Sequence, residues 1–159
     1  MRSLLVTLVL LCSALHCSAE DDPNYAYAIT FSGGFATTRY AKSEYANGLR
    51  KDRPDCIVVN WSYAPRVEGN DDELKPERDR ADAAVSAELE LRPDAVVAAT
   101  TLRGLNGLWI IYATTGQDLG AALERRLQGL NNSRVRVRIT PDAEWALLSR
   151  YVKSLGEKQ

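Results

Sequence analysis

Histidine and cysteine are scarce in this chain. Its 159 residues include one histidine, His16, and three cysteines, and only Cys56 of these four residues lies beyond residue 19. If the first 19 residues are removed, no imidazole remains, which excludes Ser-His-Asp and Cys-His nucleophiles, a histidine general base and histidine-containing zinc sites. One remaining thiol also excludes a disulfide within the chain and a metal clamp of two cysteines.

The chain also lacks an excess of charge of either sign. It has 20 Lys and Arg against 21 Asp and Glu, a formal net charge of -1, and loss of Arg2 with the first segment makes this -2. General attraction to nucleic acid needs clustered positive charge, so we expect no nucleic-acid partner. No G-x-S-x-G, Walker loop, dinucleotide fingerprint or C-x-x-C occurs, and we expect no cofactor.

The first 19 residues have the pattern of a secretory signal peptide. Arg2 precedes an apolar run, and the small residues Cys17 and Ala19 stand at positions -3 and -1 of a cut before Glu20. The apolar run has about 12 residues, fewer than the ~20 that a helix needs to cross a bilayer. We expect cleavage and a secreted or periplasmic protein with no membrane span. A retained anchor and a lipid attached to Cys17 are the alternatives.

The apolar fraction of 45% fits one ordinary folded domain. In residues 20–54 apolar residues alternate on both sides of a glycine pair, which predicts a β-hairpin followed by a connecting segment. Cys56 begins the next apolar strand. A lone cysteine there is either buried or paired between chains, and burial is the expectation.

Residues 55–153 alternate between strand and helix patterns. The spacing of apolar residues predicts strands at 56–63, 95–102, 108–113 and 134–140, and helices at 76–91, 115–130 and from 141 or 142 onward. Pro76 fits the first turn of its helix, and Thr115 is the expected cap of the next one.

This order predicts an α+β fold of the ferredoxin-like βαββαβ type, with an N-terminal β-hairpin and a C-terminal helix. In such a sheet the second strand, 95–102, lies at an edge. Its apolar character on both faces is unusual for an edge, so the N-terminal hairpin or the final helix is expected to cover it.

Aromatic landmarks recur in a characteristic order: Trp61 with Tyr63, then Pro76, then Gly107 with Trp109 and Tyr112, then Asp142 to Trp145. In this order they resemble the bacterial family called Domain of Unknown Function 695, over about residues 55–151. That family is similar to the regulator that inhibits ribonuclease E, a cytoplasmic protein. The resemblance implies a fold and supplies no catalytic residue.

Three aromatic residues, Trp109, Tyr112 and Trp145, could line a ligand pocket, and the alternative is that they fill the core. Carboxylates beneath such a pocket could support a histidine-independent hydrolase or a small-ligand site. The acidic stretch containing Glu68 and residues 71–73 could hold calcium, but it lacks the spacing of an EF-hand, and a solvated loop is favoured.

The segment 134–140 alternates strictly, and its arginines Arg134, Arg136 and Arg138 project on one side at a spacing of about 6.6–6.8 Å. A row of guanidinium groups could bind carboxylates, phosphates or an acidic partner surface. Alternatively, it is an exposed face or an edge protected by charge. We expect an exported, non-catalytic protein that binds a protein partner here, for example as an inhibitor or immunity-type protein.

Overall fold

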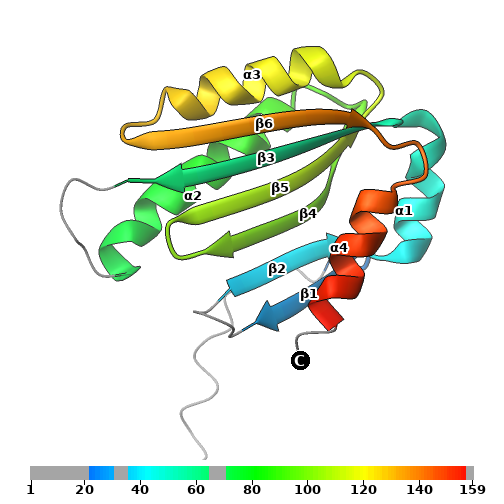
Figure 1. The fold of residues 1–159 in the computed structure, drawn as a ribbon, viewed down its shortest axis with the longest axis horizontal. Coiled ribbons are helices and arrows are strands. Elements are labelled where there is room, and N and C mark those ends of the chain that lie inside the picture. Colours follow the sequence, from blue (N-terminus) through cyan, green and yellow to red (C-terminus); the bar gives the residue numbers. More distant parts are fainter. Residues whose placement is uncertain (1–21, 31–35, 65–70, 157–159) are drawn as a thin grey trace, which may run out of the picture.

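The computed structural model of the chain is an α+β fold built on a six-stranded antiparallel sheet (Figure 1). It describes residues 22–30, 36–64 and 71–156. The strands are β1 (Tyr25–Thr30), β2 (Ala36–Ala41), β3 (Asp55–Tyr63), β4 (Ala95–Arg103), β5 (Asn106–Ala113) and β6 (Ser133–Pro141). The helices are α1 (Ser43–Leu49), a short 3-10 turn (Arg50–Asp52), α2 (Asp71–Leu89), α3 (Gly116–Gln128) and α4 (Ala146–Gly156). The expected signal peptide, residues 1–19, and Glu68 lie outside the described residues.

The strands lie in the order β1-β2-β4-β5-β3-β6. The sheet therefore has six strands, and the N-terminal hairpin covers the strand 95–102, as one of the two expected alternatives had it. The hairpin β1–β2 extends the sheet, because β2 pairs with β4 from Ala36 opposite Arg103 to Tyr40 opposite Ala99. This pairing explains why β4 is apolar on both faces: it is an inner strand of the sheet and not an edge.

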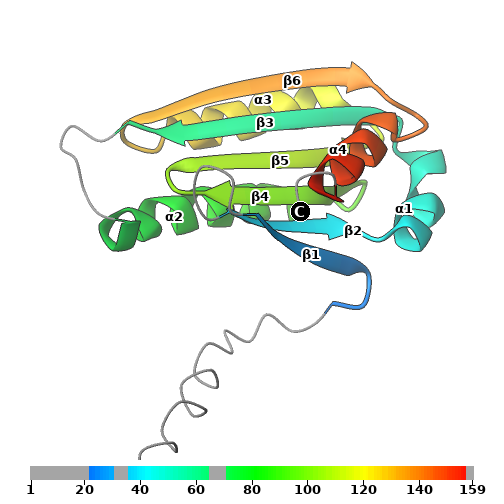
Figure 2. The ribbon, with the colours of Figure 1, turned by 60° about the horizontal axis from the view of Figure 1, so that its bottom comes forward.

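Helices α2 and α3 cover one face of the sheet, which we call the α2–α3 face (Figure 2). Its core combines strand residues with the apolar stripe of α3, and the largest members include Trp61, Trp109 and Ile111, each at most 2% exposed. Burial of a side chain of this size stabilises a fold by about 1.5–3 kcal/mol. The two helices do not reach β1, where the side chains of Tyr27 and Ile29 are 44% and 50% exposed.

The opposite face, the α4 face, is only partly covered. Helix α4 crosses it in front of the strands (Figures 1 and 2). Beneath α4 lies a second core that includes Cys56, Ile110, Tyr112 and Leu148. Cys56 is fully buried, and this burial raises the pKa of its thiol to about 11. The arginines of β6 lie on the uncovered part of this face.

The start of one helix and the capping of another differ from the sequence predictions. Helix α2 begins at Asp71, so Pro76 lies inside it and not in the first turn, where a missing N–H would cost nothing. Thr115 occupies the N-cap position of α3 but makes no capping hydrogen bond. Instead, Oδ2 of Asp55 accepts a hydrogen bond of 2.7 Å from the backbone N–H of Gly116. The carboxylate of Asp55 on β3 therefore accepts a hydrogen bond from one of the free backbone N–H groups at the start of α3.

No helix within the described ranges is both long enough and apolar enough to span a membrane.

Candidate functional site

Strand β6 forms one end of the sheet and carries the three arginines on the α4 face. Arg134, Arg136 and Arg138 are all exposed, and they lie opposite Ser62, Asn60 and Val58 of β3. None of the three takes part in an ion pair with another described residue. Three guanidinium groups on one strand are therefore available to carboxylates or phosphates from outside.

The intervening residues of β6 face the other way. Val135, Val137 and Ile139 are partly buried and pack against the core of the α2–α3 face. Helix α3 comes close to β6 through two glycines, because a Cβ added at Gly116 or Gly120 would lie 2.9 or 2.6 Å from atoms of Ile139. Strict alternation thus gives β6 an anchored apolar side and a free cationic side.

A shallow groove of 630 Å³ runs across the α4 face from β6 toward β4. It is lined by Asn60, Trp61, Ser62, Thr101, Arg103, Asn106, Gly107, Leu108, Arg134, Val135 and Arg136. No described residue of this lining is acidic. The groove therefore combines positive charge at its margins with neutral hydrogen-bonding groups on its floor.

The strand register explains this arrangement. Arg134 lies opposite Ser62, Ser62 lies opposite Asn106, and Asn106 lies opposite Arg103. These four residues form one row across the sheet. Since neighbouring strands lie about 4.8 Å apart, the backbones of β6 and β4 are separated by about 14 Å.

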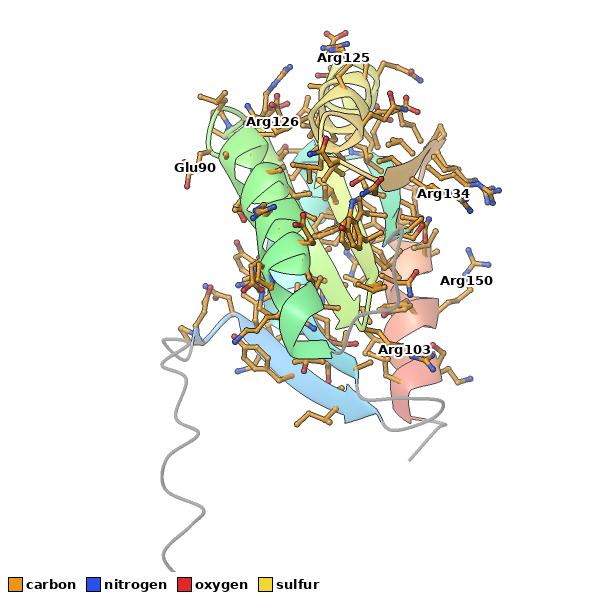
Figure 3. The ribbon with its side chains drawn as sticks, turned by 90° about the vertical axis from the view of Figure 1, so that its left-hand side faces the viewer. Glu90, Arg103, Arg125, Arg126, Arg134 and Arg150 are labelled. Atoms are coloured by element: carbon orange, nitrogen blue, oxygen red, sulfur yellow. The ribbon has the colours of Figure 1, made fainter. Side chains whose placement is uncertain are left out.

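Side chains from three elements point to this side of the molecule. In Figure 3 the labelled Arg103, Arg134 and Arg150 all lie on the α4 side, whereas Arg125 lies on α3 at the top of the view. Arg150 is an exposed residue of α4. The positive charge of the arginine row therefore continues onto the helix that borders the open part of the α4 face.

The three aromatic residues predicted as pocket walls do not lie together. Trp109 is fully buried on the α2–α3 face, and its Nε1 donates a 2.9 Å hydrogen bond to Oδ1 of Asp82 on α2. Tyr112 and Trp145 belong to the core under α4, where their rings stack with centroids 4.0 Å apart. All three are at most 2% exposed and form parts of two cores on opposite sides of the sheet. Trp109 and Trp145 border two separate cavities, of 240 and 320 Å³, and share neither.

Asp142 connects the second aromatic pair to the start of α4. It accepts hydrogen bonds from the backbone N–H groups of Ala146 and Leu147, at 2.8 and 2.9 Å, and from the hydroxyl of Tyr112 at 2.7 Å. Burial alone would raise the pKa of Asp142, but the hydrogen bonds outweigh it and hold this pKa below its usual value. The pKa of Tyr112 is raised, by burial and by its bond to Asp142.

Trp145 has an uncommon backbone conformation in this cap. Its φ is +54°, in the left-handed region that side chains with a Cβ rarely adopt. Its indole Nε1 donates a 3.0 Å hydrogen bond to the carbonyl oxygen of Arg53. The turn before α4 thus positions the indole against both Tyr112 and the segment that precedes β3.

The carboxylates beside the aromatic residues do not form a pair. Asp82 bonds to Trp109 on one face of the sheet, and Asp142 bonds to Tyr112 on the other. The side chains of residues 71–73, considered above as calcium ligands, lie outside the described part of the structure. Within that part, no group of three or more His, Cys, Asp or Glu residues could hold a metal ion.

Sequence reasoning identified the arginines of β6 but not the opposite margin of the groove. Arg103 follows an apolar segment, and the sequence predicts it to lie in a loop. Only the strand order places it in the same cross-strand row as Arg134. The sequence does indicate the floor of the groove. Asn60 and Ser62 alternate with apolar residues along β3, a pattern that predicts a polar face on an otherwise buried strand.

A scan against protein-family models finds no match to the chain, and searches of curated proteins and of solved structures find no significant similarity.

Proposed function

We propose that this protein is a non-catalytic binding protein that recognises an acidic surface of a protein partner through the groove between β6 and β4. The observation that carries the proposal is the lining of the groove: Arg134 and Arg136 at one margin, Arg103 at the other, and no acidic residue among the described lining residues. Guanidinium groups bind carboxylates through paired hydrogen bonds, and a row of them favours several carboxylates at once.

The shape of the groove favours a macromolecular partner over a small molecule. Small-molecule sites enclose most of the ligand and are lined mainly by apolar side chains. Here the large aromatic side chains are packed in the two cores, and the 630 Å³ groove is open, with polar or cationic residues at seven of its eleven lining positions. An extended acidic surface can contact both margins of the groove, whereas a single small anion cannot span about 14 Å.

We further propose that the partner is encountered outside the cytoplasm, as an enzyme neutralised by an inhibitor or immunity-type protein would be. The pattern of residues 1–19 supports export. The described residues include no histidine and only the buried Cys56, a composition that suits binding better than acid–base or thiol chemistry.

We also infer that β3 to β6, with α2 and α3, are a ferredoxin-like unit to which the hairpin β1–β2 has been added. The strand order β4-β5-β3-β6 and the positions of α2 after β3 and α3 after β5 support this relation. Kinship with Domain of Unknown Function 695 remains our hypothesis, supported by the order of the aromatic landmarks.

A pull-down from periplasmic extract tests the binding function. We expect the wild type to retain a partner that an Arg134→Ala/Arg136→Ala/Arg138→Ala variant loses. A Lys51→Ala/Lys75→Ala/Arg125→Ala variant removes the same charge from exposed positions outside the groove and should retain the partner. Equal recovery by the wild type and the triple arginine variant would contradict the proposal.

A further inference from the structure

We propose that one segment of the partner, beside the surface that contacts the groove, is an extended strand of alternating acidic and apolar residues. It adds to the free edge of β6, on the side of β6 away from the groove. This inference rests on the proposed binding function and specifies the shape of the partner. It follows from three features of β6: its position at the end of the sheet, the row of arginines on one side, and the partly buried apolar residues on the other.

The edge of β6 is open. In the strand order, β6 is the last strand and pairs only with β3 among the described strands. An edge strand presents unpaired N–H and C=O groups, which can form hydrogen bonds with an added strand. The pairing with β3 extends from Ser133 to Pro141, so β6 offers an edge of nine residues.

The spacing of the arginines matches an extended ligand. Residues two apart on a strand are separated by about 6.6–6.8 Å, and an added strand has the same repeat. Acidic residues at alternate positions of that strand would face Arg134, Arg136 and Arg138 in turn. Opposite charges directly across two strands stabilise the pairing, and like charges destabilise it.

The apolar side of β6 indicates which residues the ligand carries between its acidic positions. Val135, Val137 and Ile139 are only partly buried, although α3 packs over them. Side chains between the acidic residues of an added strand would continue this apolar layer beside α3. A ligand of alternating acidic and β-branched residues therefore satisfies both sides of the edge.

The same arginines disfavour a second copy of this chain. Antiparallel pairing of β6 with another β6 around a two-fold axis would bring arginine rows together on one face. Charged edge residues commonly protect a strand from such association. The arginines of β6 repel a basic strand and attract an acidic one. They therefore both protect the edge from self-association and select an acidic partner strand.

Fluorescence anisotropy with defined peptides tests the proposal on the full protein. The probe is a nine-residue peptide with blocked ends in which Glu alternates with Val or Thr. A permuted peptide of identical composition keeps the charge but loses the alternation. Two further versions of the probe carry N-methyl groups on one or the other backbone edge, which removes the hydrogen-bond donors of that edge.

We expect the alternating peptide to bind at least about tenfold more tightly than the permuted one, and one N-methylated version to lose at least about tenfold in affinity. The Arg134→Ala/Arg136→Ala/Arg138→Ala variant should lose binding, and bound peptide should slow hydrogen exchange of β6 amides. Equal binding of the alternating, permuted and both methylated peptides would overturn strand addition while leaving the acidic-surface function intact. If the triple arginine variant binds the alternating peptide as tightly as the wild type does, the requirement for acidic residues in the ligand would be wrong.

Discussion

The two faces of the sheet use the same strands in different ways. On the α2–α3 face, side chains of β3, β5 and β6 meet two long helices and form a continuous core. On the α4 face, the 11-residue α4, with a smaller contribution from α1, covers part of the strands and leaves polar and cationic side chains exposed. Period-two alternation allows this division, because successive side chains of a strand point to opposite faces. We therefore expect stability to depend mainly on the first face and binding on the second.

The largest loss of stability is expected from Trp109→Ala. The Trp109 side chain is fully buried, and its removal would leave a cavity and take the hydrogen-bond donor from Asp82. Truncation of a buried tryptophan costs about 3–5 kcal/mol. Urea unfolding followed by circular dichroism measures it. Leu91→Ala is the control, because Leu91 is 69% exposed and its truncation should change stability by less than about 0.5 kcal/mol.

The next largest effect is expected from Asp142→Ala on the α4 face. This change removes the acceptor for two N–H groups of α4 and for the buried hydroxyl of Tyr112. Loss of the cap and of the Tyr112 partner together should cost about 2–3 kcal/mol. A cost as large as that of Trp109→Ala would show that the two faces do not differ in the way described.

The pH dependence of stability sharpens this test. Because the native pKa of Asp142 is lowered from that of the unfolded chain, its ionised form stabilises the fold at neutral pH. That contribution should be lost as the pH falls through the lower native pKa. We expect the stability advantage of the wild type over Asp142→Asn to be constant above about pH 5 and to decrease in acid. An advantage that does not change between pH 6 and pH 2 would contradict the assignment.

A smaller loss is expected from Gly107→Ala, at a position where the two faces meet. Gly107 lines the groove, yet a Cβ there would lie 2.7 Å from Cζ3 of the Trp109 indole. The buried indole cannot move freely, so overpacking should cost about 1–3 kcal/mol. Gly48→Ala is the matched control, since a Cβ at this helical position meets no atom within 4 Å and should leave stability unchanged or raised.

The smallest effect on stability is expected from the triple arginine variant. Arg134, Arg136 and Arg138 are exposed and form no ion pair with another described residue. Their replacement by alanine should change the free energy of unfolding by no more than about 0.5 kcal/mol, while partner binding is lost. A large loss of stability would show that the arginine row supports the fold, and the proposed division between the faces would be wrong.

Alternation made some of this arrangement predictable. The sequence indicated that the arginines of β6 share a face and that Asn60 and Ser62 lie on the polar side of β3, because side-chain direction along a strand depends only on position. The α+β class was likewise predicted from the order of the elements. The same parity separates Trp109 from Tyr112, since residues three apart on a strand point to opposite faces.

One contact between distant segments was expected, since coverage of the strand 95–102 by the N-terminal hairpin was one of two alternatives and β2 pairs with β4. Other features of this kind were not predicted. The groove requires Arg103 to lie three strands away from Arg134, and only the strand order brings this about. The start of α3 is capped by Asp55, 61 positions earlier in the chain, and not by the adjacent Thr115. Local propensity suggests where a helix begins, but a tertiary contact can supply the hydrogen bond.

The left-handed backbone of Trp145 has a consequence for how α4 is attached. Glycine would adopt this conformation without strain, whereas tryptophan incurs a cost of about 1–2 kcal/mol. The stacking on Tyr112 offsets that cost only while the helix remains in place. Detaching α4 would break the ring stack and the hydrogen bond from Tyr112 to Asp142 in one event and would uncover the Cys56 thiol. The last helix should therefore separate from the sheet in a single cooperative step, not by gradual fraying from its first turn.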